Sequence, residues 1–126
     1  LPENIVCKYC GLAERAQIHD LFGDHDVFLF PTYSENYGQA IAESLVSGCP
    51  VMTSLDTPWT DMNESNVGWA LDIWDGNESF VQELNRIAAM GEEEMGVLRE
   101  SLAQYVNNKM DTAGLKDKYY QLFTDR

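Results

Sequence analysis

Basic residues are scarce in this sequence. Its 126 residues include 8 lysines and arginines against 21 aspartates and glutamates, and the formal net charge at pH 7 is -13. Such a charge repels a nucleic-acid backbone and an anionic membrane surface at long range. We therefore expect no nucleic acid among the partners. A phosphorylated ligand stays compatible with this charge, because the N-terminus of a helix can present backbone N–H groups to an anion at one specific site.

Cysteine is also scarce, and its spacing matches no disulfide framework. Cys7, Cys10 and Cys49 include a single Cys-x-x-Cys pair, which argues against a four-thiolate zinc site as well. Residues three apart in a strand point to opposite faces, so we interpret Cys7 and Cys10 as buried structural residues of a strand. Reduced thiols are typical of the cytoplasm, which is the predicted location.

Long apolar runs are absent. No run approaches the ~20 residues that cross a bilayer, and the start of the chain does not resemble a signal peptide, so we predict no transmembrane segment. The chain has no initiator methionine, and we expect it to be a piece of a longer protein. Its length suits one domain with a core of its own, to which we assign residues 1–126.

Short apolar runs alternate with helical patterns over the first part of the chain. Strands are predicted at residues 4–10, 27–30, 51–53 and 68–71, and helices at residues 12–22, 38–47, 77–90, 92–110 and 111–124. Val27–Phe30 is continuously apolar, as in a central strand that is covered on both faces. This alternation predicts an α/β fold with a Rossmann-like, three-layer parallel sheet of about four strands and helices on both faces.

The most informative stretch is Pro31–Val51, which runs from a predicted loop into a helix. It places Glu35 in the loop and Glu43 inside the helix. In open parallel sheets, ligands bind at the carboxyl ends of the strands, where a loop leads into the next helix. A helix that begins near Gly38 would direct its free N–H groups into that crevice. The stretch therefore predicts a site for phosphate or another electron-rich group.

The residue pattern alone leaves the roles of the two glutamates open. Glu43 shares a polar stripe with Gln39 and Ser47 at four-residue spacing, so it could simply face solvent. Glu35 could be a loop acid near the positive end of the helix, where it would contribute up to about 1 kcal/mol. The alternative is that the two acids are paired to hold something polar.

Several segments of this region resemble the donor-binding signature of retaining glycosyltransferases. The family is the glycosyl transferases group 1 family, which is glycosyltransferase family 4-like and has two Rossmann-like domains. Its Glu-x7-Glu spacing is matched by Glu35 and Glu43, and the resemblance covers residues 2 to about 71. The similar segments are Pro31–Gly38, Glu43–Leu45, Gly48–Val51 and Thr53–Ser54, with Thr57–Trp59 and Gly68–Trp69 resembling the version in surface-polysaccharide enzymes.

The resemblance implies how a nucleotide-diphosphate sugar is bound. Glu43 would accept hydrogen bonds from the ribose hydroxyls, because a carboxylate is an acceptor that can take two O–H donors. Glu35 would contact the donor sugar near the reacting carbon and serve as the catalytic residue. The sugar hydroxyls or the diphosphate would meet the backbone N–H groups of Asn36, Tyr37, Gly38 and Gln39.

The resemblance also implies transfer without a metal or another cofactor. The sequence has no Asp-x-Asp after a strand, and we interpret its histidines, His19 and His25, as helix-surface and loop residues. We interpret Trp59, Trp69 and Trp74 as residues that pack in the core or at its rim rather than as platforms for sugar rings.

Parts of the resembled enzymes are missing here. Those enzymes have an N-terminal acceptor domain, and two earlier strand units of their donor domain bring an Arg and a Lys to the diphosphate; Lys8 and Arg15 do not stand at matching positions. We expect the chain to be the C-terminal half of a B-type donor domain, inactive alone, from an enzyme of polysaccharide or glycoconjugate synthesis. Peripheral membrane association of the longer enzyme stays open. The alternative is a non-catalytic Rossmann-like module that binds a nucleotide or a partner protein.

The missing strand units lead to a prediction for the sheet. In the strand order 3-2-1-4-5-6, Ile5–Tyr9 would be the third strand and Val27–Phe30 the fourth, with a gap of about 10 Å between them. Unpaired buried backbone groups are costly. We therefore expect Ile5–Tyr9 to move inward and pair in parallel with Val27–Phe30, with residues 68–71 towards the other edge.

Overall fold

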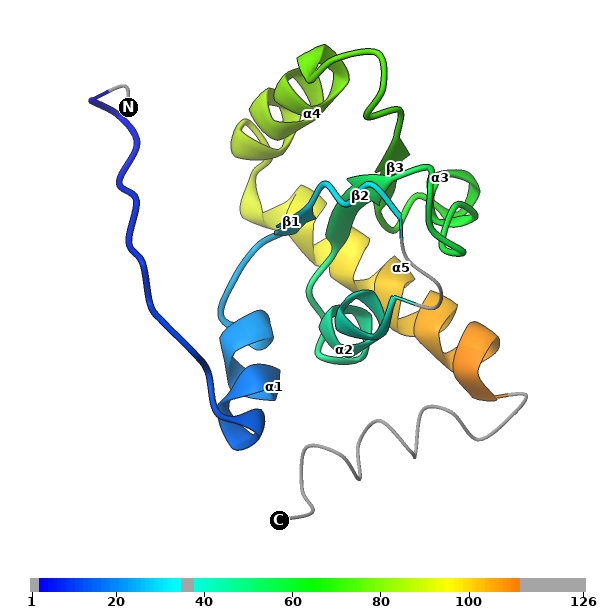
Figure 1. Cartoon of the computed structure of the whole chain (residues 1–126). Helices are drawn as coiled ribbons and strands as arrows, with labels where there is room; N and C mark the ends of the chain where they lie inside the picture. The colour runs from blue at the N-terminus through cyan, green and yellow to red at the C-terminus, as the bar shows by residue number, and fades with distance from the viewer. Residues whose placement is uncertain (1–2, 35–37, 112–126) are drawn as a thin grey trace.

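The structure, a computed structural model, describes residues 3–34 and 38–111 of the chain (Figure 1). Over these residues it has the α/β class that the sequence predicts. No helix in these two ranges is long and apolar enough to cross a membrane. The elements, in chain order, are α1 (Arg15–Gly23), β1 (Phe28–Phe30), α2 (Gln39–Val46), β2 (Val51–Ser54), α3 (Met62–Ser65), β3 (Trp69–Leu71), α4 (Glu78–Ala88) and α5 (Glu92–Asp111).

The strands form one parallel sheet in the order β1-β2-β3. Phe28 of β1 pairs with Val51 of β2, and Ser54 of β2 pairs with Leu71 of β3. Because the strands are parallel, their carboxyl ends meet at one edge of the sheet, which we call the carboxyl edge. The loops that follow the strands therefore begin side by side, at Pro31, Leu55 and Asp72.

Helices cover both faces of the sheet. Val51 packs in one core with Leu45 of α2 and Leu102 of α5, whereas Met52 packs in a second core with Phe80 of α4. Neighbouring residues of a strand point to opposite faces, so each core takes one of the two β2 side chains. In Figure 1, α5 crosses behind the sheet from the α4 side to the α2 side, consistent with its contribution to both cores.

The predicted helix at residues 38–47 is confirmed, with α2 spanning Gln39–Val46. Gly38 is its N-cap and adopts a left-handed conformation with φ of 79°. After Ser47, Gly48 is again left-handed, with φ of 84°, and Pro50 follows. Glycine adopts such angles without the steric cost of a Cβ, and proline does not continue a helix, so the sequence defines both ends of α2.

The strand predicted at residues 4–10 is wrong, and so is its pairing with β1. Val6 and Tyr9 are 94% and 92% exposed, and both Cys7 and Cys10 are exposed instead of buried. Figure 1 shows this segment running away from the sheet. A short apolar run is stable as a strand only when it pairs and packs. The described sheet consequently has three strands instead of about four.

The position predicted for Val27–Phe30 needs a related correction. The strand forms as β1, but within the described residues it lies at an edge of the sheet instead of at its centre. Leu29 is accordingly 46% exposed. The continuous apolar run is typical of a strand with two covered faces, yet it carries no information about whether a neighbouring strand is present on each side.

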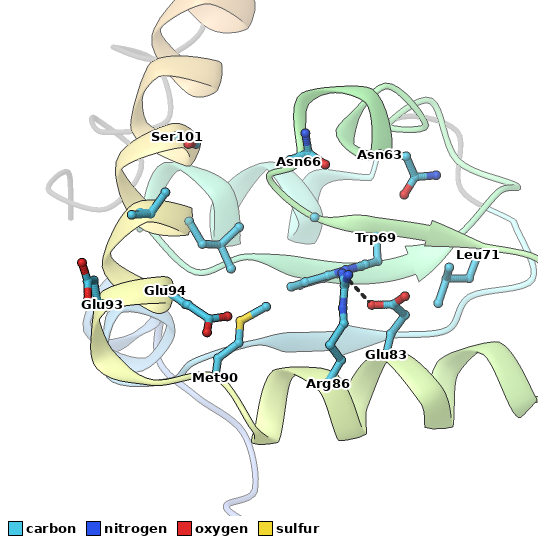
Figure 2. Close-up of a pocket in the computed structure, with 13 residues that line it drawn as sticks. Asn63, Asn66, Trp69, Leu71, Glu83, Arg86, Met90, Glu93, Glu94 and Ser101 are labelled. Carbon is cyan, nitrogen blue, oxygen red and sulfur yellow. Dashed lines mark ion pairs between the residues drawn. The ribbon is translucent and has the colours of Figure 1, made fainter.

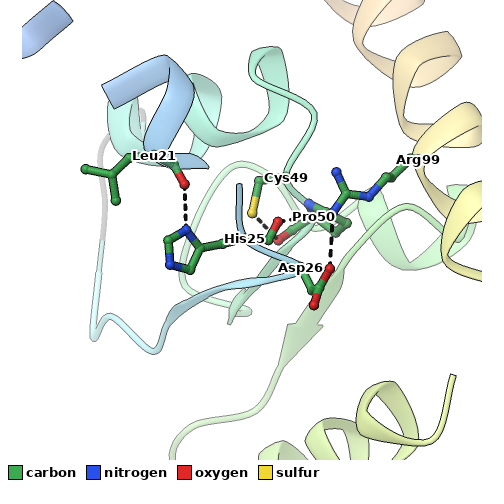
Figure 3. A network of polar contacts seen from close by, with 6 residues as sticks. All are labelled: Leu21, His25, Asp26, Cys49, Pro50 and Arg99. Atoms are coloured by element: carbon green, nitrogen blue, oxygen red, sulfur yellow. Dashed lines mark hydrogen bonds and ion pairs between the residues drawn. The ribbon is translucent and has the colours of Figure 1, made fainter. Parts of the chain in front are cut away.

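Polar contacts connect α5 to the residues that directly precede β1 (Figure 3). Arg99 Nη2 donates to the His25 carbonyl at 3.2 Å and lies 3.3 Å from Asp26 Oδ1. His25 Nδ1 is in turn 2.6 Å from the Leu21 carbonyl oxygen at the end of α1. Nearby, burial raises the pKa of the Cys49 thiol, which keeps this side chain neutral. The contacts of Arg99 and His25 fix the turn between α1 and the sheet.

Candidate functional site

Gly38 stands where α2 begins, on the loop that follows β1. A Cβ atom at this position would lie 3.0 Å from Trp59 Nε1 and 3.0 Å from Ile41 Cδ1. Together with the left-handed φ, this crowding means that the fold itself requires glycine here. Trp59 is the protein group that occupies the space beside Gly38.

Gln39 and Glu43 lie one turn apart on α2. Gln39 Nε2 donates to Glu43 Oε1 at 3.4 Å, a long and therefore weak hydrogen bond. Gln39 is exposed and Glu43 is half-buried, so the carboxylate retains acceptor capacity on the surface. Farther along the same stripe, Ser47 Oγ donates to the Glu43 carbonyl at 2.8 Å and lies 3.0 Å from His19 Nδ1 of α1. The stripe is thus partly covered by α1.

The structure brings together three of the six predicted site residues. Gly38, Gln39 and Glu43 all lie on the first two turns of α2 or at its N-cap. Glu35, Asn36 and Tyr37, the other three, lie outside the described residues.

A cation also contacts the Trp59 ring. Lys109 Nζ of α5 is 4.4 Å from the centre of the Trp59 ring and 2.8 Å from Asp61 Oδ1. Tyr105 Oη donates to the same Asp61 oxygen at 2.9 Å. Trp59 therefore contacts both the start of α2 and the lysine of α5. The sequence offered no local signal for Lys109, because it joins this cluster from 48 positions beyond Asp61.

The charge states within this cluster follow from its contacts. Burial raises the pKa of the Asp61 carboxyl, but hydrogen bonds from Lys109 and Tyr105 outweigh burial, and the net pKa lies below its ordinary value. Burial, followed by the bond to Asp61, raises the pKa of Tyr105 above its ordinary value. The cluster hence holds an ionised carboxylate and a protonated phenol at neutral pH.

The three tryptophans do not share one environment. Trp59 and Trp69 are 2% and 7% exposed, which confirms the packing role predicted for them. Trp74 is 70% exposed on the loop after β3, so it packs at the rim rather than in the core. Its ring is 5.2 Å from that of Tyr33, and its Nε1 donates to Asp56 Oδ2 at 2.8 Å. Since Tyr33, Asp56 and Trp74 each come from a different loop, local periodicity gave no sign of this arrangement.

A large cavity lies elsewhere in the molecule. It has a volume of about 910 Å³ and is bordered by β3, α4 and α5 (Figure 2). Trp69 lies at its floor, and Glu83 forms an ion pair of 2.9 Å with Arg86 beside it. Its size suits a small molecule, but it contains none of the predicted site residues. We therefore place the candidate site at the carboxyl edge.

No protein-family model matches the chain, and neither a curated protein nor a solved structure is significantly similar to it.

Proposed function

We propose that the chain is the donor-binding part of a retaining, metal-independent glycosyltransferase that uses a nucleotide-diphosphate sugar in polysaccharide or glycoconjugate synthesis. One observation carries the proposal. Glu43 is a half-buried carboxylate on a helix that begins with a left-handed glycine, and this helix follows the first strand of a parallel sheet. The Glu-x7-Glu signature of the sequence supports the same function.

Each residue has a defined role in this proposal. Glu43 accepts hydrogen bonds from the ribose diol, and its bond to Gln39 is weak enough to be exchanged for them. The free N–H groups at the start of α2 face the anionic part of the donor. Glu35 contacts the donor sugar beside the carbon that is transferred. The two acids therefore bind opposite ends of one ligand.

The transfer step moves charge onto the diphosphate. The bond between the sugar carbon and the diphosphate oxygen breaks, the new bond to the acceptor oxygen forms on the same face of the sugar, and the proton of the acceptor hydroxyl passes to the leaving diphosphate. Preorganised N–H groups and cations stabilise the leaving diphosphate without a metal. The arginine and lysine that resembled enzymes use for this purpose belong to a preceding segment, so we expect this chain to bind the donor weakly.

Calorimetry of the chain with UDP- and GDP-sugars tests the proposal. We expect Glu43→Ala to weaken binding by about 1.5 to 3 kcal/mol, or roughly ten- to more than a hundredfold, because a carboxylate that accepts from two hydroxyls is lost. Glu43→Gln, which keeps the shape and one acceptor, should bind with intermediate affinity.

Glu100→Ala is the matched control, since Glu100 is an exposed acid of a different helix, α5. It should bind like the unmodified chain. Equal affinities of Glu43→Ala and the unmodified chain would contradict the proposal. Binding of UDP or GDP that an attached sugar never strengthens would favour the non-catalytic nucleotide-binding module instead.

A further inference from the structure

We propose that Tyr33, Asp56 and Trp74, which we call the edge platform, bind a pyranose ring of the acceptor saccharide, in addition to the contacts that the acceptor domain of the resembled enzymes would make. The identification of the saccharide as an acceptor rests on the proposed function, whereas the binding of a pyranose does not. The platform lies at the carboxyl edge and takes one residue from each of the three loops that follow the strands.

A series of contacts links the three loops of the edge platform and holds its side chains in place. The Trp74 ring lies 5.2 Å from the Tyr33 ring, with 45° between the two planes, and its Nε1 donates to Asp56 Oδ2 at 2.8 Å. The backbone N–H of Asp56 donates to Ser54 Oγ at 3.3 Å, and this hydroxyl donates to the Thr32 carbonyl at 2.6 Å. Thr32 directly precedes Tyr33 in the sequence, so these contacts connect all three residues of the edge platform.

A further contact fixes the loop of Trp74. Its backbone N–H donates to Asp72 Oδ1 at 2.9 Å, which forms a local turn directly after β3. Tyr33 and Trp74 nevertheless stay 67% and 70% exposed. Two large aromatic side chains are thus positioned by the fold without being covered by it. Exposed aromatic surface that is held in place in this way is typical of a binding site.

The chemistry around the rings favours a neutral, hydroxyl-rich ligand. The free face of an indole or phenol ring provides apolar surface, which suits the C–H face of a pyranose. Carboxylate oxygens accept hydrogen bonds from hydroxyl groups. Beside Trp74 lies a pocket of about 250 Å³ with three carboxylates and two neutral polar side chains: Asp72, Asp75, Glu78, Ser79 and Gln82.

The same carboxylates exclude an anionic ligand from the edge platform. The phosphates of a nucleotide would lie near Asp56, Asp72 and Asp75, where like charges repel. The donor nucleotide is therefore expected at α2, and the edge platform is left for the uncharged substrate. Tyr33 precedes Glu35 by two positions in the sequence, so a saccharide on the edge platform would be bound by the same loop that carries the proposed catalytic residue.

Saturation-transfer NMR with methyl pyranosides and neutral oligosaccharides tests this proposal on the chain as it stands. We expect saccharide signals that Trp74→Ala and Tyr33→Ala each weaken on the order of tenfold, because each removes half of the aromatic surface. Asp56→Asn should weaken binding less, because an amide oxygen can still accept from Trp74 Nε1. Tyr9→Ala is the matched control, as Tyr9 is an exposed tyrosine of residues 3–12, which form no strand.

Two further measurements separate this proposal from the donor-site proposal. Trp74→Ala should still bind the nucleotide-sugar that the unmodified chain binds, and Glu43→Ala should still bind the saccharides. If no nucleotide-sugar binds while the saccharides do, the donor site fails and the edge platform stands.

Three outcomes would overturn the edge platform. One is that no saccharide of the panel gives a signal, and another is that Trp74→Ala, with an unchanged melting temperature, binds as well as the unmodified chain. The third concerns cations, which aromatic rings and carboxylates also attract. If choline binds to the edge platform in preference to the saccharides and salt abolishes this binding, the site is one for a cation.

Discussion

Asp61 is the residue through which the loop after β2 is joined to α5. It accepts hydrogen bonds from Tyr105 Oη and Lys109 Nζ at 2.9 and 2.8 Å, and the lysine also covers the Trp59 ring. Trp59 in turn lies against Gly38, where α2 begins. The carboxylate of Asp61 therefore supports, through two packed side chains, the helix that carries Glu43.

Replacement of Asp61 by asparagine should destabilise the fold in a pH-dependent manner. The pKa of Asp61 is lower in the folded chain than in the unfolded chain. Its contribution is accordingly present above the unfolded value of about 4 and is lost as the pH falls through the folded value. We expect Asp61→Asn to lower the free energy of unfolding by about 0.5 to 1.5 kcal/mol at pH 7, a range reduced because the side chain is half exposed.

Urea denaturation between pH 7 and about pH 3 measures this difference. The gap between Asp61→Asn and the unmodified chain should shrink steadily towards the acid end. Glu64→Gln, at an exposed acid of the neighbouring α3, should differ from the unmodified chain by less than about 0.5 kcal/mol at every pH. A gap for Asp61→Asn that stays constant over this range would show that the carboxylate charge is not what matters.

At the scale of elements, β3 lies at an edge of the sheet that the described residues form, and a side chain pairs with its outer backbone groups. Asn63 of α3 donates from Nδ2 to the Ala70 carbonyl at 2.8 Å, and its Oδ1 accepts from the Ala70 N–H at 2.9 Å. The amide thus takes the place that a further strand would have. Because the N–H and C=O of Ala70, at the middle of β3, are both bonded to Asn63, another chain cannot add a strand through these two groups.

Asn63→Ala should therefore weaken the edge of the sheet. Ala70 is 3% exposed, so loss of the amide leaves a buried N–H and a buried C=O without their partner, at a cost of about 1 to 3 kcal/mol. Hydrogen exchange should show loss of protection at the Ala70 amide, and urea denaturation should show the lower stability. Glu64→Ala, on the same short helix, is the control. Unchanged protection at Ala70 in Asn63→Ala would refute this role.

The elements were predicted from the sequence to different degrees. The ends of α2 followed from Gly38 and Gly48, because backbone angles at these positions are a local property. The run at residues 4–10 has the composition of a strand and yet forms none, because a strand needs a partner that composition does not reveal. Of the site, the residues on α2 were found from a local signature. The edge platform was missed because three loops build it.

At the scale of the whole molecule, the folded part begins at α1. Residues 3–12 contribute exposed apolar side chains and no strand, with Leu12 fully exposed. The start of α1 has its own contact, since the backbone N–H of Glu14 donates to Gln17 Oε1 at 3.3 Å. The cores on both faces of the sheet are built entirely from residues that come later in the chain. The first twelve residues should therefore be dispensable for folding.

Removal of residues 1–12 should change the free energy of unfolding by less than about 0.5 kcal/mol, because the exposed side chains of residues 3–12 add little stability. Urea denaturation of the shortened and the complete chain measures the change. Leu102→Ala shows that the assay is sensitive, because truncation of this fully buried side chain of α5 should cost about 2 to 5 kcal/mol. A loss above about 1 kcal/mol in the shortened chain would mean that residues 4–10 do pack on the β1 edge in solution, as the sequence pattern predicts and the structure does not show.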